Sequence, residues 1–436
     1  MTDHSRSPHV GTRVSTRLRT ACLPLFLAVF FSVLPAAEGT AQSREPRTLD
    51  AGRLAHLDRV FSAYVEDGKM AGSVVRVLRD GRLAYERSFG MRDIESGDAM
   101  HPDAIFRIAS QTKAIVSVGI MMLEERGDLL ITDPLGKYLP EFRETTVAEP
   151  GEDGQYSVVP AVRAITIRDL LTHTSGIGYG YGPASGEWAA AGIQGWYFAD
   201  RDEPVGETVR RMAALPFDAQ PGTRFVYGYS TDILGAVIEV VSGEPLDVFL
   251  SKSILGPLDM HDTHFYLPEE KSGRLATVYS VRSDGTLERA PDTGDRVAQG
   301  AYVRGPRRSF SGGAGLLSTA RDYSRFLQMM LNGGTLDGQR ILSHTTVNLM
   351  TVDHLGDVSF RSGEGMGLGF SVLEDVGRRG VPGSTGEYGW GGAYHSVYWV
   401  DPVEGLVVVY FTQLLPAGDV DDHRKLRTLV YQALDD

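Results

Sequence analysis

Ser110 and Lys113 stand three positions apart, just before a long apolar segment. This segment runs from Ala114 to Leu123 and predicts a buried helix, so the two side chains share one face of its first turn. A hydroxyl at a helix N-terminus lies beside unpaired backbone N–H groups, which favour negative charge on a nearby oxygen. We therefore interpret Ser110 as a candidate nucleophile and Lys113 as its base. Because Ser-x-x-Lys fixes only two letters, an ordinary helix start is an alternative interpretation.

A serine–lysine pair needs a third group that carries a proton to the leaving atom. Tyr227 is the candidate for this role. It follows a turn at Pro221-Gly222 and precedes an apolar helix predicted over 231–241, which would hold its phenol at the wall of a cleft.

The same chemistry needs a second backbone N–H to complete an oxyanion hole. Trp390, Gly391, Gly392 and Ala393 lead into a strand predicted over 394–400, and paired glycines let a ligand approach the backbone closely. We predict that the N–H groups of Ser110 and Ala393 form the oxyanion hole.

The elements that must position these residues form a sheet at both ends of the chain and a helical middle. Two strands joined by a tight turn at Asp80-Gly81 form a predicted hairpin. Other strands are predicted over 366–373, 394–400 and 406–412, and helices over 49–65, 165–171, 231–241, 319–331 and 421–434. This pattern predicts an α/β fold of the α+β type, with an antiparallel sheet flanked by N- and C-terminal helices.

The predicted organisation is one composite domain behind a signal peptide. The signal peptide covers 1–41, the sheet region covers 42–140 and 309–436, and an inserted, mostly helical region covers 141–308. The seam between the sheet and the inserted region is the expected place for a cleft.

The composition indicates a globular, exported protein. The chain has 436 residues, of which 42% are hydrophobic and 23% charged, and its formal net charge is −13. Arg13, Arg17 and Arg19 precede an apolar run over 21–34, a pattern typical of a secretory signal peptide and too short for a stable membrane anchor. Cys22, in that run, is the only cysteine, which excludes thiol catalysis in the mature protein. We expect a periplasmic or secreted location.

Several segments together resemble one family of enzymes. They are 107–113 (RIASQTK), 165–176 (ITIRDLLTHTSG), 221–235 (PGTRFVYGYSTDILG) and 311–319 (SGGAGLLST). From Leu54 onward the chain resembles the serine β-lactamase-like hydrolases, which include class C β-lactamases, D-amino-acid peptidases and family VIII carboxylesterases. The resemblance implies a β-lactamase/transpeptidase-like fold and an acyl-enzyme on Ser110, with Lys113 and Tyr227 as its partners.

Two departures from the lactamase pattern bear on the substrate. Tyr229 stands where the Tyr-x-Asn motif has asparagine, and Trp390-Gly391-Gly392 stands where the lactamases have Lys-Thr-Gly. The missing lysine would hold the carboxylate of a β-lactam, and an indole carries no charge. The resemblance therefore favours a carboxylesterase acting on small uncharged esters. A β-lactamase or a D-amino-acid peptidase or amidase of the same fold is the alternative, and a catalytically inactive binding protein is a third possibility.

Six residues are candidates for contact with the substrate: Gln111, Tyr229, Trp390, Gly391, Gly392 and His395. Tyr179, Tyr181 and Trp188 could line the acyl pocket together with Gln111, and ordinary packing is an equal alternative for these four. His395 could face the cleft or pack on the sheet, because strand alternation leaves both directions open.

Rival chemistries have weaker sequence support. The chain contains no Gly-x-Ser-x-Gly, and His173 in a helix-ending turn is interpreted as a structural hydrogen bonder. His261 and His264 lack a third ligand, so we predict neither a metal nor a cofactor. The expected partner is a small-molecule ester or amide. The acidic surface argues against nucleic acid, and the sequence does not predict the oligomeric state.

Overall fold

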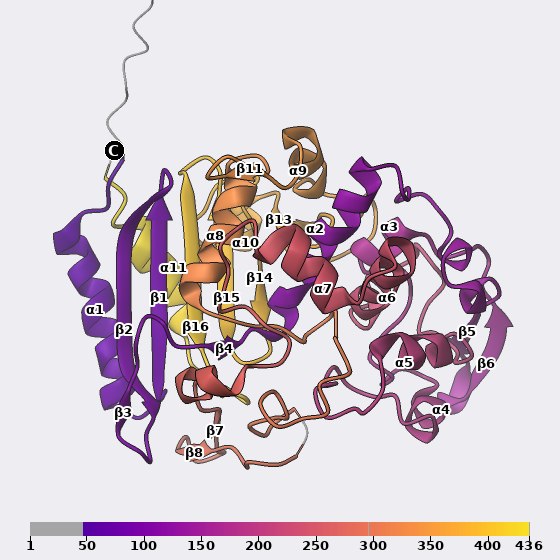
Figure 1. Ribbon diagram of the computed structural model, residues 1–436, viewed down its shortest axis with the longest axis horizontal. Coiled ribbons are helices and arrows are strands. Elements are labelled where there is room, and N and C mark those ends of the chain that lie inside the picture. The colour runs from indigo at the N-terminus through magenta and orange to yellow at the C-terminus, as the bar shows by residue number, and fades with distance from the viewer. Residues whose placement is uncertain (1–46, 295, 436) are drawn as a thin grey trace, which may run out of the picture. The chain divides into compact units, whose positions relative to one another are not determined.

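An eight-stranded antiparallel sheet organises the part of the chain that the structure, a computed structural model, describes, which is residues 47–294 and 296–435 (Figure 1). Pro46–Asp436 forms one compact unit. The strand order β12-β13-β14-β15-β16-β1-β2-β3 brings the two ends of this unit together, because β16 pairs with β1. The strands are β1 (Gly72–Arg79), β2 (Arg82–Asp93), β3 (Asp98–Ala99), β12 (Glu364–Met366), β13 (Ser371–Leu373), β14 (Tyr388–Gly392), β15 (Ser396–Asp401) and β16 (Leu406–Thr412).

Helices cover both faces of this sheet. Helices α1 (Ala51–Glu66) and α11 (Asp422–Tyr431) pack on one face, where Phe61 and Leu426 meet Val75 and Tyr410. Helices α2 (Thr112–Glu125) and α8 (Ala320–Leu331) pack on the other face (Figure 1). Because both faces are covered, every residue of β16 is buried and the strand shows no polar alternation.

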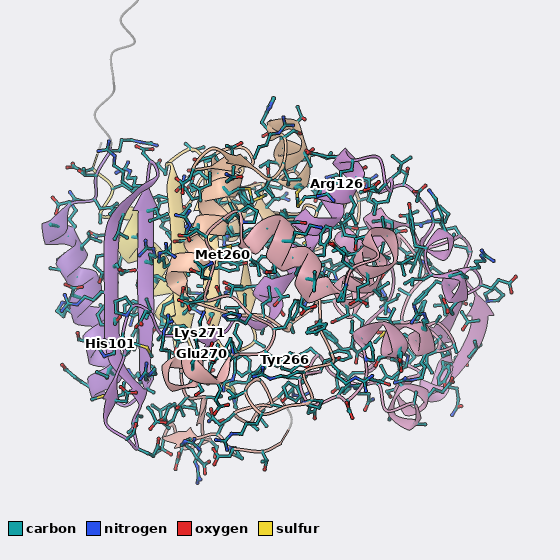
Figure 2. The ribbon with its side chains drawn as sticks, viewed as in Figure 1. His101, Arg126, Met260, Tyr266, Glu270 and Lys271 are labelled. Carbon is teal, nitrogen blue, oxygen red and sulfur yellow. The ribbon has the colours of Figure 1, made fainter. Side chains whose placement is uncertain are left out.

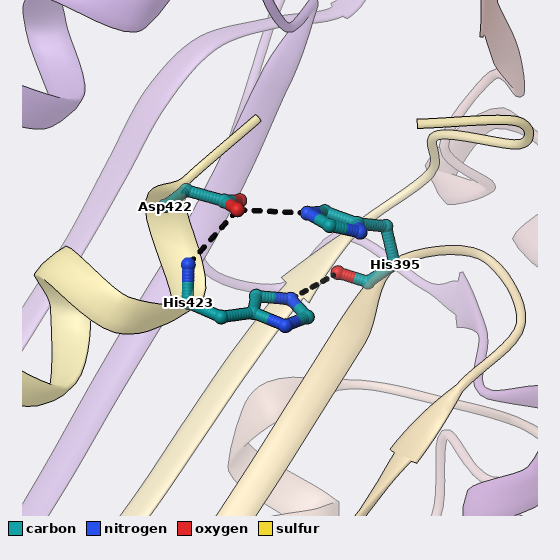
Figure 3. Close-up of side chains that lie close together, drawn as sticks. All are labelled: His395, Asp422 and His423. Carbon is teal, nitrogen blue, oxygen red and sulfur yellow. Dashed lines mark hydrogen bonds and ion pairs between the residues drawn. The ribbon is translucent and has the colours of Figure 1, made fainter. Parts of the chain in front are cut away.

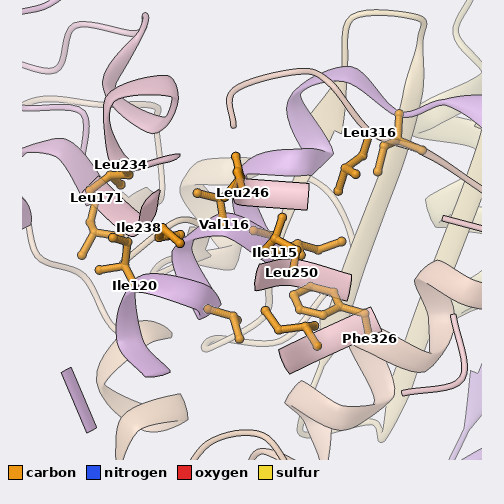
Figure 4. Close-up of a cluster of buried hydrophobic side chains, with 14 of the residues drawn as sticks. Ile115, Val116, Ile120, Leu171, Leu234, Ile238, Leu246, Leu250, Leu316 and Phe326 are labelled. Atoms are coloured by element: carbon orange, nitrogen blue, oxygen red, sulfur yellow. The ribbon is translucent and has the colours of Figure 1, made fainter. Parts of the chain in front are cut away.

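Helix α2 is buried because it lies between the sheet and the helical region. Figure 4 shows Ile115 and Val116 of α2 beside Leu246 and Leu250. Ile120, one turn further along α2, lies beside Leu171 and Ile238. Every residue from Thr112 to Leu123 is buried. The helical region contains α3 (Ile167–Leu171), α4 (Ser185–Ala190), α5 (Val205–Met212), α6 (Ser230–Ser242) and α7 (Leu246–Leu250).

The structure has the elements that the sequence predicted from turn residues and helix-capping residues. The β1–β2 hairpin turns at Asp80 and Gly81, both with positive φ. Thr166 caps α3 in a capping box with Asp169, and α6 ends at Gly243 in the left-handed conformation. The predicted fold class is confirmed as well.

The structure differs from the predicted strands around the glycines of β14. Trp390, Gly391 and Gly392 do not lead into a strand but are themselves part of β14, and β15 begins only at Ser396. Glycines at alternate positions hid the apolar pattern of this strand. The strand predicted over 366–373 is two short strands, β12 and β13, with a turn between them.

The inserted region also contains two hairpins that the sequence analysis missed, and several short elements complete the fold. The hairpins are β5 (Thr146–Pro150) with β6 (Tyr156–Pro160) and β7 (Tyr279–Val281) with β8 (Leu287–Arg289). The remaining elements are β4 (Phe106–Arg107), β9 (Leu317–Ser318), β10 (Thr335–Leu336), β11 (Gln339–Arg340), α9 (His344–Met350) and α10 (Val376–Arg379).

The predicted signal peptide lies outside the described residues. Among the helices of residues 47–294 and 296–435, none combines the length and the apolar character that a membrane crossing requires.

Candidate active site

Ser110 lies in a short 3-10 turn, η1 (Ala109–Gln111), that continues directly into α2. Ala109, the residue before it, has a φ of +44°, a conformation that costs energy for any residue except glycine. Ala109 and Gln111 are buried, whereas Ser110 is half-buried. The turn is therefore held rigidly while its hydroxyl stays accessible.

Lys113 Nζ binds three oxygen atoms, none of which carries a full negative charge. It donates to Ser110 Oγ at 3.4 Å, to the Tyr179 hydroxyl at 3.1 Å and to the Gly313 carbonyl oxygen at 2.7 Å. We call Ser110, Lys113, Tyr179 and Gly313 the lysine cluster. Lys113 is almost completely buried and forms no ion pair with another described residue. Its contact with Ser110 Oγ places Lys113 where it can accept the serine proton.

Asp232 holds the backbone that binds the lysine. Its Oδ1 accepts hydrogen bonds from Ser311 Oγ at 2.6 Å and from the Gly313 N–H at 3.0 Å. Burial raises the pKa of Asp232, although these two hydrogen bonds and the Lys113 charge act in the opposite direction. Asp232 therefore fixes the Gly313 carbonyl oxygen without touching Lys113. The sequence analysis did not single out this aspartate.

The structure brings Tyr227 next to Lys113 and Trp390. Lys113 Nζ lies 4.7 Å from the centre of the Tyr227 ring, and Trp390 Nε1 donates to the Tyr227 oxygen at 3.1 Å. The described residues contain no hydrogen bond from the Tyr227 oxygen to Ser110 or Lys113. Its proposed role in proton transfer stays a prediction, because a bound substrate would have to complete the path.

Tyr179 is the group that the sequence analysis underestimated, since it was considered only as pocket lining. Its hydroxyl bonds directly to Lys113, and its ring packs edge-to-face on Tyr227 with the ring centres 5.7 Å apart. Burial raises the pKa of Tyr179 well above its ordinary value, with smaller effects from Tyr227 and Asp232. The phenol therefore stays protonated at neutral pH and can link Lys113 to a bound substrate through hydrogen bonds.

The uncharged imidazole ring of His173 packs against the ring of Tyr227. The two ring centres lie 4.7 Å apart. Burial, with a smaller effect from the Lys113 charge, lowers the pKa of His173 well below its ordinary value. The expectation of a structural hydrogen bonder was therefore wrong, because His173 Nδ1 has no hydrogen-bond partner among the described residues and the ring contributes packing instead.

The predicted oxyanion donors lie on two segments that pack together. A Cβ at Gly392 would lie 2.6 Å from the Ile108 carbonyl oxygen, so only glycine lets the end of β14 approach the turn of Ser110 this closely. Ala109 and Ala393 share a small apolar cluster. Within the described residues, neither the Ser110 nor the Ala393 N–H donates to another protein group. Their role as oxyanion donors stays a prediction.

Two of the six predicted substrate contacts lie elsewhere. Tyr229 is fully buried, stacks on Trp188 and donates to the Gly195 carbonyl oxygen at 2.7 Å, so it packs in the core and does not face a substrate. His395 packs against α11, on the face of the sheet away from Lys113, where its Nε2 binds Asp422 at 2.7 Å. The ring therefore does not face Ser110.

The other predicted contacts stay predictions. Gln111 is buried with a side-chain amide that has no partner among the described residues. Trp390 is half-buried and stacks on Phe360, and the Arg361 guanidinium lies 5.0 Å from the Trp390 ring centre. The segment from Trp390 to Ala393 also lines a groove of about 300 Å³ with Arg361, His395, His423 and Arg427, and this groove does not include Ser110 or Lys113.

Tyr181 and Trp188 were the remaining candidates for the acyl pocket. Trp188 is buried and donates to the Pro216 carbonyl oxygen at 2.9 Å, so it is a core residue. Tyr181 is exposed and accepts a hydrogen bond from Arg296 at 3.1 Å.

His261 and His264 do not form a metal pair. Lys271, labelled in Figure 2, lies with its Nζ 3.1 Å from His264 Nε2, and a cation there would repel a metal ion. Burial, with a contribution from Lys271, lowers the pKa of His264 to about 4. His261 is exposed beside Asp259.

Known proteins are similar to this chain in sequence and in fold. The model of the Beta-lactamase family matches residues 57–432. Esterase EstB of Burkholderia gladioli is 34% identical over 407 residues, which cover 87% of this chain and 96% of EstB. An uncharacterised protein of Mycobacterium tuberculosis is 35% identical over 373 residues, covering 81% of this chain and 88% of that protein.

A solved structure agrees with these relatives. EstCE1, described as a hydrolase with promiscuous acyltransferase activity, has a TM-score of 0.73 and 28% identity, with 87% of this chain and 99% of that chain covered.

The fold and the Ser110–Lys113 pair define a serine hydrolase with the β-lactamase/transpeptidase fold. The chain belongs to the Beta-lactamase family, and an esterase is among its relatives.

Proposed function

We propose that this protein is a carboxylesterase that forms an acyl-enzyme on Ser110 with small uncharged esters. The observation that carries this proposal is the position of Trp390, whose indole N–H binds the Tyr227 oxygen and whose half-buried ring packs between Tyr227 and Phe360. An aromatic wall suits an apolar alcohol or acyl group better than a charged one. The similarity to EstB, an esterase, supports the same substrate class.

The geometry supports a two-step reaction. Ser110 Oγ attacks the ester carbonyl carbon while its proton passes to Lys113, and the Ser110 and Ala393 N–H groups stabilise the oxyanion. The leaving alcohol takes up a proton through Tyr179 or Tyr227 as its bond to carbon breaks. Water then attacks the acyl-enzyme along the same path, releases the acid and restores the Ser110 hydroxyl.

A second candidate is β-lactam hydrolysis, favoured by the place of Arg361. Its guanidinium lies over the Trp390 ring, which puts a positive charge near the position where lactamases have their lysine. Arg361 is exposed and also lies 3.5 Å from Glu364, so it would hold a carboxylate weakly. We therefore expect slow turnover of penicillins and cephalosporins.

Hydrolysis assays on the purified protein test these proposals. We expect rapid hydrolysis of 4-nitrophenyl acetate and butyrate, slow hydrolysis of a chromogenic cephalosporin, and no turnover of either by Ser110→Ala. Full activity in Ser110→Ala would remove the mechanism. Cephalosporin turnover faster than ester turnover would overturn the assignment of Trp390.

We also propose that the protein is exported and that residues 1–41 are removed. The sequence pattern of this segment supports the proposal. Cell fractionation with N-terminal sequencing of the purified protein tests it. A cytoplasmic protein that keeps Met1 would contradict it.

A further inference from the structure

The turn that carries the predicted oxyanion donor has an unusual conformation. Ala393 lies between β14 and β15, and the turn is closed by a hydrogen bond from the His395 N–H to the Gly392 carbonyl oxygen at 3.1 Å. His395 has a φ of +64°, a left-handed conformation that non-glycine residues rarely adopt. The turn therefore depends on contacts that hold residue 395.

Two adjacent residues at the start of α11 supply these contacts (Figure 3). His395 Nε2 donates to Asp422 Oδ1 at 2.7 Å, and His423 Nε2 donates to the backbone oxygen of His395 at 3.1 Å. The two imidazole rings stack with their centres 4.1 Å apart. Residue 395 is thus held through both its side chain and its backbone.

Asp422 is the fixed point of this arrangement. It is fully buried, and its Oδ2 accepts a hydrogen bond from the Tyr410 hydroxyl at 2.6 Å. Burial raises the pKa of Asp422, but the hydrogen bond and charge of His395, with smaller effects from His423 and Tyr410, outweigh it and leave the pKa below its ordinary value. We call His395, Asp422, His423 and Tyr410 the histidine cluster.

A metal site is the competing explanation for these side chains. Ligand atoms of His395, Asp422 and His423 lie within 4.8 Å of one another. However, the two rings are inclined by only 17°, and an imidazole nitrogen binds a metal through a lone pair in its ring plane. Lone pairs of two nearly parallel rings do not converge on one ion. Hydrogen bonding accounts for the cluster better.

We propose that the histidine cluster positions the oxyanion hole by fixing the peptide group of Ala393. The turn is clamped between α11 and the segment before Ser110, because Gly392 packs on the Ile108 carbonyl oxygen. A preorganised N–H needs no reorientation as negative charge develops, so its benefit appears mainly in the transition state. This inference rests on the proposed acyl-enzyme reaction. The histidines are positioning residues and do not touch the substrate.

Ester hydrolysis by three variants tests the inference. His395→Gly accepts the left-handed conformation but removes the bond to Asp422, and we expect kcat to fall about 30-fold with KM changed less than about twofold. The affinity for a boronic acid that mimics the tetrahedral intermediate should fall by a similar factor. His395→Asn tolerates the same conformation and keeps an N–H donor, so it should recover most of kcat.

Tyr64→Phe is the matched control. Tyr64 donates to Asp421, the residue beside Asp422, so this variant loosens the same helix start without touching the histidine cluster. We expect its kcat to equal that of the wild type. An equal loss of kcat in Tyr64→Phe would overturn the inference, because docking of α11 alone would then explain the effect.

Further outcomes separate this inference from the proposed function. An unchanged kcat in a folded His395→Gly variant overturns the inference alone. If that variant does not fold, Tyr410→Phe replaces it, with an expected fall in kcat of about threefold at constant KM, and no fall would overturn the inference. A wild-type protein without esterase activity would remove the proposed function and this inference together.

Discussion

The lysine cluster and the histidine cluster lie on opposite sides of the sheet, and they treat charge in opposite ways. Lys113 binds a hydroxyl, a phenol and a carbonyl oxygen, with no carboxylate in contact. His395 binds the buried carboxylate of Asp422 directly. Lys113 thus contacts the serine hydroxyl that it must deprotonate, whereas the imidazole is held in place by its carboxylate partner. The comparison indicates that one cluster serves the chemistry and the other serves its alignment.

The largest expected effect comes from removing the mobile proton of the lysine cluster. Lys113→Met keeps a similar buried volume but cannot accept the Ser110 proton, so we expect kcat/KM for 4-nitrophenyl butyrate to fall about 10⁴-fold. Steady-state kinetics measure this change. A loss no greater than that of His395→Gly would break the distinction between the clusters.

A smaller loss is expected when the two sides of the turn are forced apart. Gly392→Ala would place its Cβ 2.6 Å from the Ile108 carbonyl oxygen, which must displace β14 from Ser110. We expect kcat to fall about 10²-fold, as for loss of an oxyanion donor. Gly391→Ala is the matched control, because its Cβ would meet only the Ser396 carbonyl oxygen at 3.3 Å. Equal kcat values for the two variants would contradict the predicted oxyanion hole.

Tyr179→Phe tests the unexpected member of the lysine cluster. It removes one of three partners of Lys113, so we expect kcat to fall about tenfold. Tyr229→Phe removes a buried hydroxyl bonded to Gly195 and serves as the control, with kcat within about twofold of the wild type. If the two variants lose activity equally, packing and not proton transfer explains Tyr179.

The pH dependence of stability tests one histidine on each face of the sheet, His173 on the Lys113 side and His423 on the α11 side. Burial lowers the pKa of His173 well below its ordinary value, and it lowers that of His423 as well. Below a pH of about 6.5 the unfolded chain therefore binds more protons than the folded one, and stability falls as the pH falls. Thermal melting between about pH 7.5 and 5 should show this decline. We expect His173→Gln to flatten it more than His423→Gln does, and the reverse order would contradict the comparison.

The smallest effect is expected at the rim of the groove. Arg361→Gln removes an exposed charge over Trp390, so ester hydrolysis should change less than about twofold while slow cephalosporin turnover falls about threefold. Rate measurements at low and high salt check this, because high salt should reduce the difference between Arg361→Gln and the wild type. A large loss of ester hydrolysis would show that Arg361 acts on the uncharged substrate.

The sequence predicted what depends on local signals and missed what depends on packing between distant segments. The Asp80-Gly81 turn, the Thr166 cap and the apolar run of α2 each carry a local pattern, and the structure has them. Strand β14 carries none, because its glycines remove the side chains that reveal a strand.

The predicted site shows the same division. Ser110 and Lys113 meet because one helical turn joins them, whereas Tyr179 reaches Lys113 from a loop with no motif of its own. His395 meets Asp422 only because β15 lies beside α11 in the fold. No spacing in the sequence could predict that contact, and strand alternation left the direction of His395 open.

Mass spectrometry of the protein after rapid mixing with 4-nitrophenyl butyrate tests the central claim most directly. We predict a transient butyryl group on Ser110, located by peptide mapping, that forms on the wild type and does not form on Lys113→Met within the same time. A butyryl group on another residue, or equal labelling of Ser110 in both proteins, would contradict a nucleophile activated by the lysine cluster.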